Sequence, residues 1–263
     1  MSDNAVIIEL DERGVASLCI NRPEIHNAFD DALIQQLLKA LDTIEADPKA
    51  RVLVLRSEGK SFSAGADLRW MRRMADYSEA ENMADAMELA ELMRRLNTFS
   101  KPTIARIQGA TFGGGVGLVA CCDMAVGSHA ARFSLSEVRL GLIPAVISPY
   151  VVAAIGERAA RRYFQTAERF DANEAYRLGL LHELVDETEL DSTIDGLVDN
   201  LLKGGPNALA AAKDLIFAVA HQPTTADVIT DTAKRITATR ASDEGKEGLN
   251  AFLEKRAANW IGR

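Results

Sequence analysis

The sequence has few cysteines, more acidic than basic residues, and no long hydrophobic run. Its three cysteines, Cys19, Cys121 and Cys122, are too few and too awkwardly spaced for a disulfide framework or a zinc site. No apolar stretch approaches the length of a membrane-spanning helix. The net charge of −8 argues against general nucleic-acid binding, which needs a concentrated basic surface. We therefore expect no metal site, and neither a membrane nor a nucleic acid as partner.

The composition is that of an ordinary globular protein. The chain has 263 residues, of which 48% are hydrophobic and 26% are charged, which suits one large domain or one domain with a small helical appendage. The first ten residues contain no basic segment followed by an apolar stretch, so we expect no secretory signal. With so few cysteines, a reducing cytoplasm is the expected location.

The first half of the chain alternates strand and helix signals. Apolar segments predict strands over 6–10, 15–20, 51–56, 103–107, 124–126 and 131–135, and a turn joins the first two as a hairpin. Asp30 can cap a helix whose apolar residues recur with helical spacing from Leu33 to Ile44. A long amphipathic stretch ends near residue 101, and we expect its Met83 and Met87 to pack in the core.

The C-terminal third shows only helix signals. Helices are expected over 148–155, 157–166, 172–178, 190–202, 208–220, 226–239 and 243–257. Strands that alternate with helices early in the chain, followed by helices alone, favour an α/β core with a helical C-terminal part.

A glycine-rich turn follows the strand over 103–107. Gly113, Gly114 and Gly115 leave backbone N–H groups uncovered, and a helix that begins at about Gly115 directs its positive end toward them. The turn lacks the lysine of a phosphate-binding loop and the last glycine of a dinucleotide fingerprint. Taken alone, these glycines indicate tight helix packing about as strongly as an anion site.

A second turn of similar design follows the strand over 51–56. In Ser61–Leu68, SFSAGADL, Ala64 and Gly65 are small enough to expose backbone N–H groups, and Asp67 can cap the next helix. Two such turns in one α/β core could direct two N–H donors at one carbonyl oxygen, which is the arrangement of an oxyanion hole.

These motifs together resemble the crotonase family, also called enoyl-CoA hydratase/isomerase. The resemblance rests on SFSAGADL, GATFGGGVGLVACCD and SEVRLGLIPAVISPY, with NRPEIHNAF before them and EGLNAFLEKR after them. The five motifs occur in the family's order and cover essentially the whole chain. The sequences GGGVGL and GLIPAVISPY most resemble those of the methylglutaconyl-CoA hydratase-like branch of the family. That branch is placed in leucine or acyclic-terpene degradation.

The resemblance implies both a fold and a substrate class. It implies a spiral core of repeated β-β-α turns over 1–200 and a helical trimerisation region over 201–263, with assembly into trimers or dimers of trimers. It also implies an acyl-CoA substrate and no separate cofactor, with the thioester oxygen held by the N–H groups of Ala64 and Gly114. The substrate and its CoA portion would contact residues from four parts of the chain: Ile25, Ala28, Ala64, Gly65, Ala66, Asp67, Leu68, Gly113, Gly114, Gly117, Phe252 and Lys255. Phe252 and Lys255 would help to close the CoA site, from a neighbouring subunit where the chains assemble.

The acid–base residues bear on the reaction. Hydratases of the family use two glutamates, of which the second is present as Glu137 and the first is replaced by Gly117. A glutamate before a turn is usually an idle surface residue, but its place in the second motif favours Glu137 as the acid/base at the α-carbon. Asp123 is an alternative carboxylate, although its position favours a role in fixing a turn. We assign no chemistry to the four histidines.

Three functions follow from this pattern. The first is hydration of an enoyl-CoA that carries its own carboxylate, of the 3-methylglutaconyl- or isohexenylglutaconyl-CoA type, because Gly117 would leave free space where a second glutamate would repel the substrate. Arg69 or Arg72 would then pair with the substrate's charge. The second is Δ3,Δ2-enoyl-CoA isomerisation, which needs one base. The third is a non-catalytic acyl-CoA- or RNA-binding role.

Overall fold

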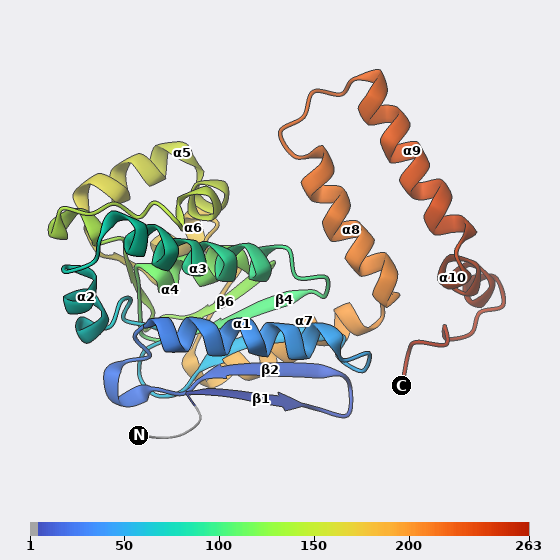
Figure 1. Ribbon diagram of the computed structural model, residues 1–263. Helices are drawn as coiled ribbons and strands as arrows, with labels where there is room; N and C mark the ends of the chain where they lie inside the picture. Colours follow the sequence, from blue (N-terminus) through green and yellow to red (C-terminus); the bar gives the residue numbers. More distant parts are fainter. Residues whose placement is uncertain (1–4, 263) are drawn as a thin grey trace.

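A six-stranded sheet forms the centre of the protein, which is described here from a computed structural model that covers residues 5–262 (Figure 1). The strand order is β1-β2-β3-β4-β6-β9, in which β1 is antiparallel to β2 and the other pairs are parallel. The strands are β1 (Val6–Leu10), β2 (Val15–Ile20), β3 (Val52–Ser57), β4 (Thr103–Ile107), β6 (Met124–Ser128) and β9 (Glu183–Val185). The predicted hairpin is confirmed at both of its strands.

A second, three-stranded sheet lies beyond the carboxyl ends of the central strands. It contains β5 (Ala110–Phe112), β7 (Arg132–Ser134) and β8 (Phe170–Asp171) in that order. Two single-residue bridges, Ser63 with Thr111 and Phe29 with Ala66, extend the same layer toward the loops after β3 and β2. Successive passes of the chain therefore run from a central strand to a short second strand and then to a helix, which is a repeated β-β-α turn.

Helices cover both faces of the central sheet (Figure 1). The helices are α1 (Asp31–Ala46), α2 (Leu68–Met74), α3 (Glu79–Asn97), α4 (Gly114–Cys121), α5 (Ser148–Thr166), α6 (Ala172–Leu178), α7 (Leu190–Leu202), α8 (Pro206–Val219), α9 (Ala226–Ala241) and α10 (Asp243–Leu253). Three short 3-10 helices are η1 (Pro23–Ile25), η2 (Glu137–Leu140) and η3 (Glu187–Glu189). Each helix in the described part of the chain is too short or too polar to cross a bilayer.

The core has two layers because successive residues of a strand point to opposite faces of the sheet. Leu53 and Leu55 of β3 belong to the large cluster that includes the apolar sides of α1 and α3. Val52 and Val54 face the other way and pack with Ile194 and other residues of α7. A strand buried on both faces must be apolar throughout, which explains the continuous VLVL segment.

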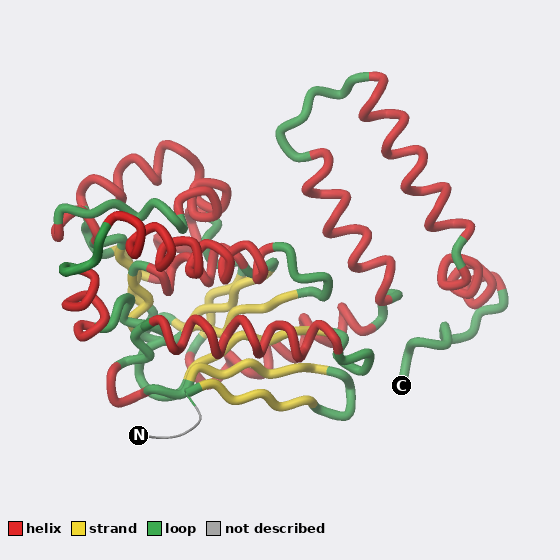
Figure 2. The backbone as a smooth tube through the Cα atoms, viewed as in Figure 1, coloured by secondary structure: helices red, strands yellow, loops and turns green. Residues whose placement is uncertain are grey.

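Helices α8, α9 and α10 form an arm that stands apart from the core (Figures 1 and 2). None of the residues of α8 and α9 is buried within this one chain. Lys213 of α8 nevertheless contacts the core through an ion pair of 3.0 Å with Asp123. The arm exposes large apolar side chains along its length: Ile216, Phe217, Ile229, Ile236, Leu249, Phe252 and Leu253.

The structure corrects one prediction about the helices and confirms another. The amphipathic stretch over 68–97 is two helices, and Met83 and Met87 are 63% and 59% exposed, so the prediction that they pack in the core is wrong. Leu92, Met93 and Leu96 supply the buried side of α3 instead. The two helices predicted over 148–155 and 157–166 are confirmed as the two halves of α5, which is broken at Gly156, where a φ of +78° is not helical.

Candidate active site

The two glycine-containing turns lie side by side in parallel register. The N–H of Ser63 donates to the Ala110 carbonyl at 3.0 Å, and the N–H of Phe112 donates to the Ser63 carbonyl at 2.8 Å. Ser63 thus pairs with Thr111, and the two segments stay close beyond this pair, because a Cβ at Gly113 would lie 3.9 Å from Gly65 Cα. The proximity that the sequence predicted for these turns is therefore present.

Residues 26–29 lie along the other edge of the first turn. The N–H of Ala64 donates to the His26 carbonyl at 2.9 Å, and the N–H of Phe29 donates to the Gly65 carbonyl at 2.7 Å. The N–H of Asp67 returns to the Phe29 carbonyl at 2.7 Å. Three segments, around residues 28, 65 and 113, therefore form one continuous layer.

The prediction that Ala64 supplies an oxyanion donor needs correction. Its N–H is already used in the hydrogen bond to His26, so it cannot also bind a substrate oxygen without breaking that bond. Ala66 is the alternative in the same turn, because its N–H and that of Gly114 donate no hydrogen bond to any residue within 5–262. Each of these unused donors directly follows one of two glycines that approach each other, Gly65 and Gly113.

Gly114 is the first residue of α4, so its N–H is one of the donors that a helix leaves unpaired at its positive end. A Cβ at Gly114 would lie 3.6 Å from the ring of Phe29, and Phe29 is also the residue that bridges to Ala66. The Phe29 side chain therefore packs against α4 while its backbone holds the first turn, which fixes the positions of both donors.

Glu137 begins η2 and brings a carboxyl group to the start of α4. Its Oε1 lies 3.2 Å from the point that a Cβ at Gly113 would occupy. Its Oε2 is buried and has no hydrogen-bond partner among the residues described. Burial raises the pKa of Glu137 above its ordinary value, because the charged form is poorly solvated there. A carboxyl group with a raised pKa next to two amide donors can exchange a proton with a carbon acid.

The space beside Gly117 is not free. A Cβ at Gly117 would overlap Cγ2 of Ile147 and lie 2.9 Å from Ile147 Cβ and 3.2 Å from Met93 Sδ. The expectation that the glycine leaves room for a substrate group is therefore wrong. An isoleucine from the segment before α5 fills the place that a side chain at 117 would take.

Four of the remaining predicted substrate contacts lie close to the two turns along the chain. Ile25 and Ala28 lie in the segment that pairs with residues 64–67, so they adjoin the two turns. Leu68 is 79% exposed at the start of α2, and the Asp67 carboxylate accepts hydrogen bonds from the Arg69 and Trp70 amides, which makes it a helix cap.

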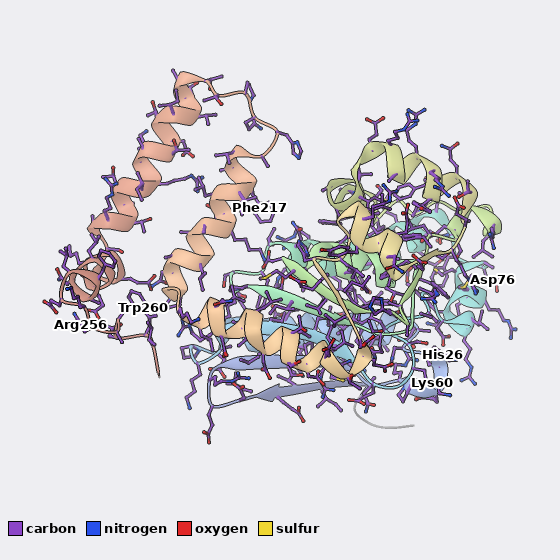
Figure 3. All side chains as sticks on the ribbon, turned by 180° about the vertical axis from the view of Figure 1, so that it is seen from behind. His26, Lys60, Asp76, Phe217, Arg256 and Trp260 are labelled. Carbon is purple, nitrogen blue, oxygen red and sulfur yellow. The ribbon has the colours of Figure 1, made fainter. Side chains whose placement is uncertain are left out.

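Phe252 and Lys255 lie far from the site within one chain. Phe252 is 81% exposed in α10, and Lys255 follows the end of that helix. Figure 3 labels the nearby Arg256 at one end of the molecule and His26 of the site region at the other. Any role of these two residues at a CoA site requires a second subunit.

The other candidate charges have clear positions. Arg73 forms an ion pair of 2.6 Å with Asp31, whereas Arg69 and Arg72 are exposed on α2 and form no ion pair in the part of the chain described. Asp123 accepts hydrogen bonds from the Thr103 amide and from Lys213 at 2.8 and 3.0 Å. Its predicted role in fixing a turn is confirmed.

Asn27 is a supporting residue that the sequence analysis missed. Its buried amide donates to the carbonyls of Glu58 and Ser61 at 2.8 and 2.7 Å, and its Oδ1 accepts from the Arg22 amide at 2.8 Å. Its φ of +55° is left-handed, a conformation that asparagine tolerates better than most residues. An asparagine inside the NRPEIHNAF motif was the available signal.

A cavity of about 870 Å³ lies elsewhere in the molecule, between the β1–β2 turn and the C-terminal residues. Arg13, Arg51 and Trp260 are among the residues that line it, and none of the predicted site residues does. The volume of a cavity therefore does not identify the site. The unpaired amides and the buried carboxyl group identify it.

Known proteins resemble this chain in sequence and in fold. Residues 11–263 match the family model described as enoyl-CoA hydratase/isomerase. The crystal structure of an enoyl-CoA hydratase from Shewanella pealeana is 45% identical, with a TM-score of 0.95 over 97% of this chain and 96% of that one. The crotonyl-CoA hydratase of Syntrophomonas wolfei is 31% identical over 100% of both chains. The 2,3-dehydroadipyl-CoA hydratase of Escherichia coli is 30% identical over 96% of this chain and 97% of its own length. The predicted crotonase-type fold is thereby confirmed, and the chain belongs to the enoyl-CoA hydratase/isomerase family.

Proposed function

We propose that this protein adds water to the double bond of an enoyl-CoA thioester. The N–H groups of Ala66 and Gly114 bind the thioester oxygen, and Glu137 transfers the proton at the α-carbon. The observation that carries the proposal is that two adjacent turns each hold an amide with no hydrogen-bond partner within residues 5–262, with a buried carboxyl group beside them.

The donors act on charge that develops during the reaction. When a nucleophile adds to the β-carbon, negative charge moves to the thioester oxygen and an enolate forms. Two preorganised N–H groups stabilise that charge more than they stabilise the neutral carbonyl. One such donor lowers the activation free energy by about 3–4 kcal/mol. Glu137, protonated more readily because of its raised pKa, gives its proton to the α-carbon of the enolate. The proton that the attacking water loses on adding to the β-carbon returns to the Glu137 carboxylate, so that one carboxyl group balances the addition.

We further propose that the acyl group carries its own carboxylate, as in 3-methylglutaconyl- or isohexenylglutaconyl-CoA. A second carboxylate in the site would repel such a substrate, and position 117 supplies none. Since Ile147 fills the space beside Gly117, the substrate's charge must lie in another direction. Arg69 and Arg72 are exposed on the helix that begins just after Ala66. One relative at 30% identity is a hydratase of 2,3-dehydroadipyl-CoA, whose acyl group ends in a carboxylate.

The test compares substrates and detects added water by mass spectrometry. The full-length protein is assayed with 3-methylglutaconyl-CoA and crotonyl-CoA, and we expect higher kcat/KM for the first. Equal or higher turnover of crotonyl-CoA would refute the carboxylated substrate, and no gain of water on any enoyl-CoA would refute hydration. The doubly substituted Arg69→Gln, Arg72→Gln variant should lose the preference for the anionic substrate while retaining activity on crotonyl-CoA.

A Δ3,Δ2-enoyl-CoA isomerase is the second candidate. It is favoured by one observation, which is that the Glu137 carboxyl group lies at the start of α4 while position 117 supplies no second carboxylate and an apolar residue fills the space beside it. Moving a proton between two carbons requires only one base. Double-bond migration without incorporation of labelled water would select this function over hydration. A protein that binds acyl-CoA and turns over none would leave the non-catalytic function.

A further inference from the structure

Glu137 and Ile147 lie beside two positions that are about one helical turn apart at the start of α4. Gly113 is the N-cap of α4, and its carbonyl accepts a hydrogen bond from the Gly117 N–H at 3.3 Å. The Glu137 carboxyl group lies against Gly113, and the Ile147 side chain lies against Gly117. One turn of a helix advances about 5.4 Å, so the isoleucine is about that far along α4 from the carboxyl group.

The surroundings of Ile147 are apolar. It is only 3% exposed, and a Cβ at Gly117 would meet it together with Met93 Sδ. Cys121 Sγ, one turn farther along the same side of α4, lies 3.7 Å from the same sulfur atom. The wall beyond Glu137 therefore consists of hydrocarbon and sulfur, and a charged or strongly hydrated group placed there would lose its solvation.

We infer that Ile147 is a specificity-determining residue, which closes the acyl pocket one helical turn beyond Glu137 and admits only small apolar substituents there. Of the two proposed types of substrate, this limit favours 3-methylglutaconyl-CoA over the bulkier isohexenylglutaconyl-CoA. The inference rests on the proposed function, because it takes the acyl α-carbon to lie at Glu137. Acyl atoms a few bonds farther along the helix then meet the isoleucine. The glycine at 117 leaves the space that the Ile147 side chain occupies, and the Ile147 side chain leaves no room for a Cβ at 117.

The first experiment tests the contact without measuring catalysis. Gly117→Ala should lower Tm in the wild-type background, because the added methyl group overlaps Cγ2 of Ile147. In an Ile147→Ala background, which removes both Cγ atoms, the same substitution should cause less than half of that fall. In an Ile147→Val background, which keeps both Cγ atoms, the full fall should remain. An equal fall in all three backgrounds would overturn the pairing.

The second experiment tests specificity. Ile147→Ala should raise kcat/KM for enoyl-CoAs with a bulkier substituent at the β-carbon, relative to crotonyl-CoA, by roughly tenfold or more. Ile155→Ala is the matched control, because Ile155 is a buried isoleucine two turns along α5. It should lower Tm by a similar amount and leave the substrate ratio unchanged. If Ile147→Ala does not fold, Ile147→Val should change the ratio in the same direction by a smaller factor.

The outcomes separate the inference from the proposed function. A substrate ratio that stays within threefold of wild type, in a folded Ile147→Ala or Ile147→Val protein, would overturn the specificity role while leaving the hydratase proposal intact. A wild-type protein that acts on no enoyl-CoA would overturn the proposed function and the specificity role together. Coupled Tm changes would then identify Ile147 as a packing residue only.

Discussion

At the scale of single residues, the site depends on polar groups that the fold leaves without partners. Glu137 Oε2 is buried and unpaired, and the amides of Ala66 and Gly114 donate no hydrogen bond within residues 5–262. Unpaired buried groups cost free energy in the folded protein. Of these three groups Glu137 Oε2 is the buried one, and its position beside two unused amides indicates that a ligand, here the thioester with its carbonyl and acyl α-carbon, completes their interactions.

Replacing Glu137 by glutamine should reduce kcat by about 10²- to 10⁴-fold, because the amide cannot exchange a proton with the α-carbon. Glutamine has nearly the same shape, so binding of the CoA thioester should change little. Stopped-flow or steady-state kinetics with the preferred enoyl-CoA measures the loss, and titration with a saturated acyl-CoA measures binding. Unchanged turnover would remove Glu137 from the mechanism.

The same variant should be more stable than wild type at neutral pH. Burial raises the pKa of Glu137 in the folded protein, so the proton is bound more tightly in the folded than in the unfolded chain. The resulting stabilisation is fully present below the ordinary pKa of 4.5 and is lost as pH rises through the raised value. In thermal melts from pH 4 to pH 8, the Tm of Glu137→Gln minus the Tm of the wild type should increase as pH rises. A constant difference would contradict the raised pKa.

Gly114→Pro should abolish one oxyanion donor while preserving the helix. Gly114 is the first residue of α4, where proline is well tolerated because that N–H has no partner within the helix. We expect kcat to fall by about 10²- to 10³-fold. Gly114→Ala keeps the N–H, and its Cβ would lie 3.6 Å from the Phe29 ring, an ordinary contact. Comparable losses in the two variants would argue against the donor role.

At the scale of elements, the site is assembled where strands end and helices begin. The turn after β3 and the turn after β4 lie in parallel register, and η2 brings Glu137 to the start of α4. The segment from η2 to the start of α5 therefore supplies both the carboxyl group and Ile147. Ile147 is the N-cap residue of α5, and this helix is interrupted at Gly156.

Gly156→Ala should lower the free energy of unfolding by about 1–3 kcal/mol. The φ of +78° and ψ of 156° at this position are accessible to glycine and strained for any residue with a Cβ. No atom lies within 4 Å of the added methyl group, so the loss would come from the backbone alone. Gly196→Ala in α7 is the control, because it also meets open space but lies in a regular helix. It should stabilise the protein by about 0.5–1 kcal/mol, and urea unfolding measures both.

At the scale of the whole molecule, the arm of α8, α9 and α10 is too exposed to be stable alone. Within one chain α8 and α9 bury no residue, and large apolar side chains remain in contact with water. Exposed apolar surface on this scale is typical of an interface. We propose that the arm packs against other subunits in a trimer or a dimer of trimers, and that Phe252 and Lys255 reach a neighbouring CoA site there.

Phe252→Asp should therefore weaken both assembly and substrate binding. Sedimentation analysis of the wild type should give three or six times the mass of the chain, and the variant should shift toward smaller species with a higher KM for the acyl-CoA. Tyr176→Asp, at an exposed aromatic residue on α6, is the control and should change neither. A wild type that sediments as a monomer with full activity would contradict this role for the arm.

Local sequence signals determined much of this protein. Both strands of the hairpin, the Asp30 cap of α1, the bounds of α6 and α7, and the break at Gly156 follow from alternation, capping and glycine placement, which act over a few residues. The motifs also indicated the family and pointed to Glu137.

Only the tertiary structure decided which atoms meet. Ala64 and Ala66 are equally small neighbours of Gly65, but the Ala64 N–H donates to the His26 carbonyl whereas the Ala66 N–H is unused within residues 5–262. Gly117 suggests an empty space until Ile147, thirty positions later in the chain, fills it. These contacts join segments that are distant in sequence, so their geometry depends on how the whole chain packs and on the register between loops, which no local pattern encodes.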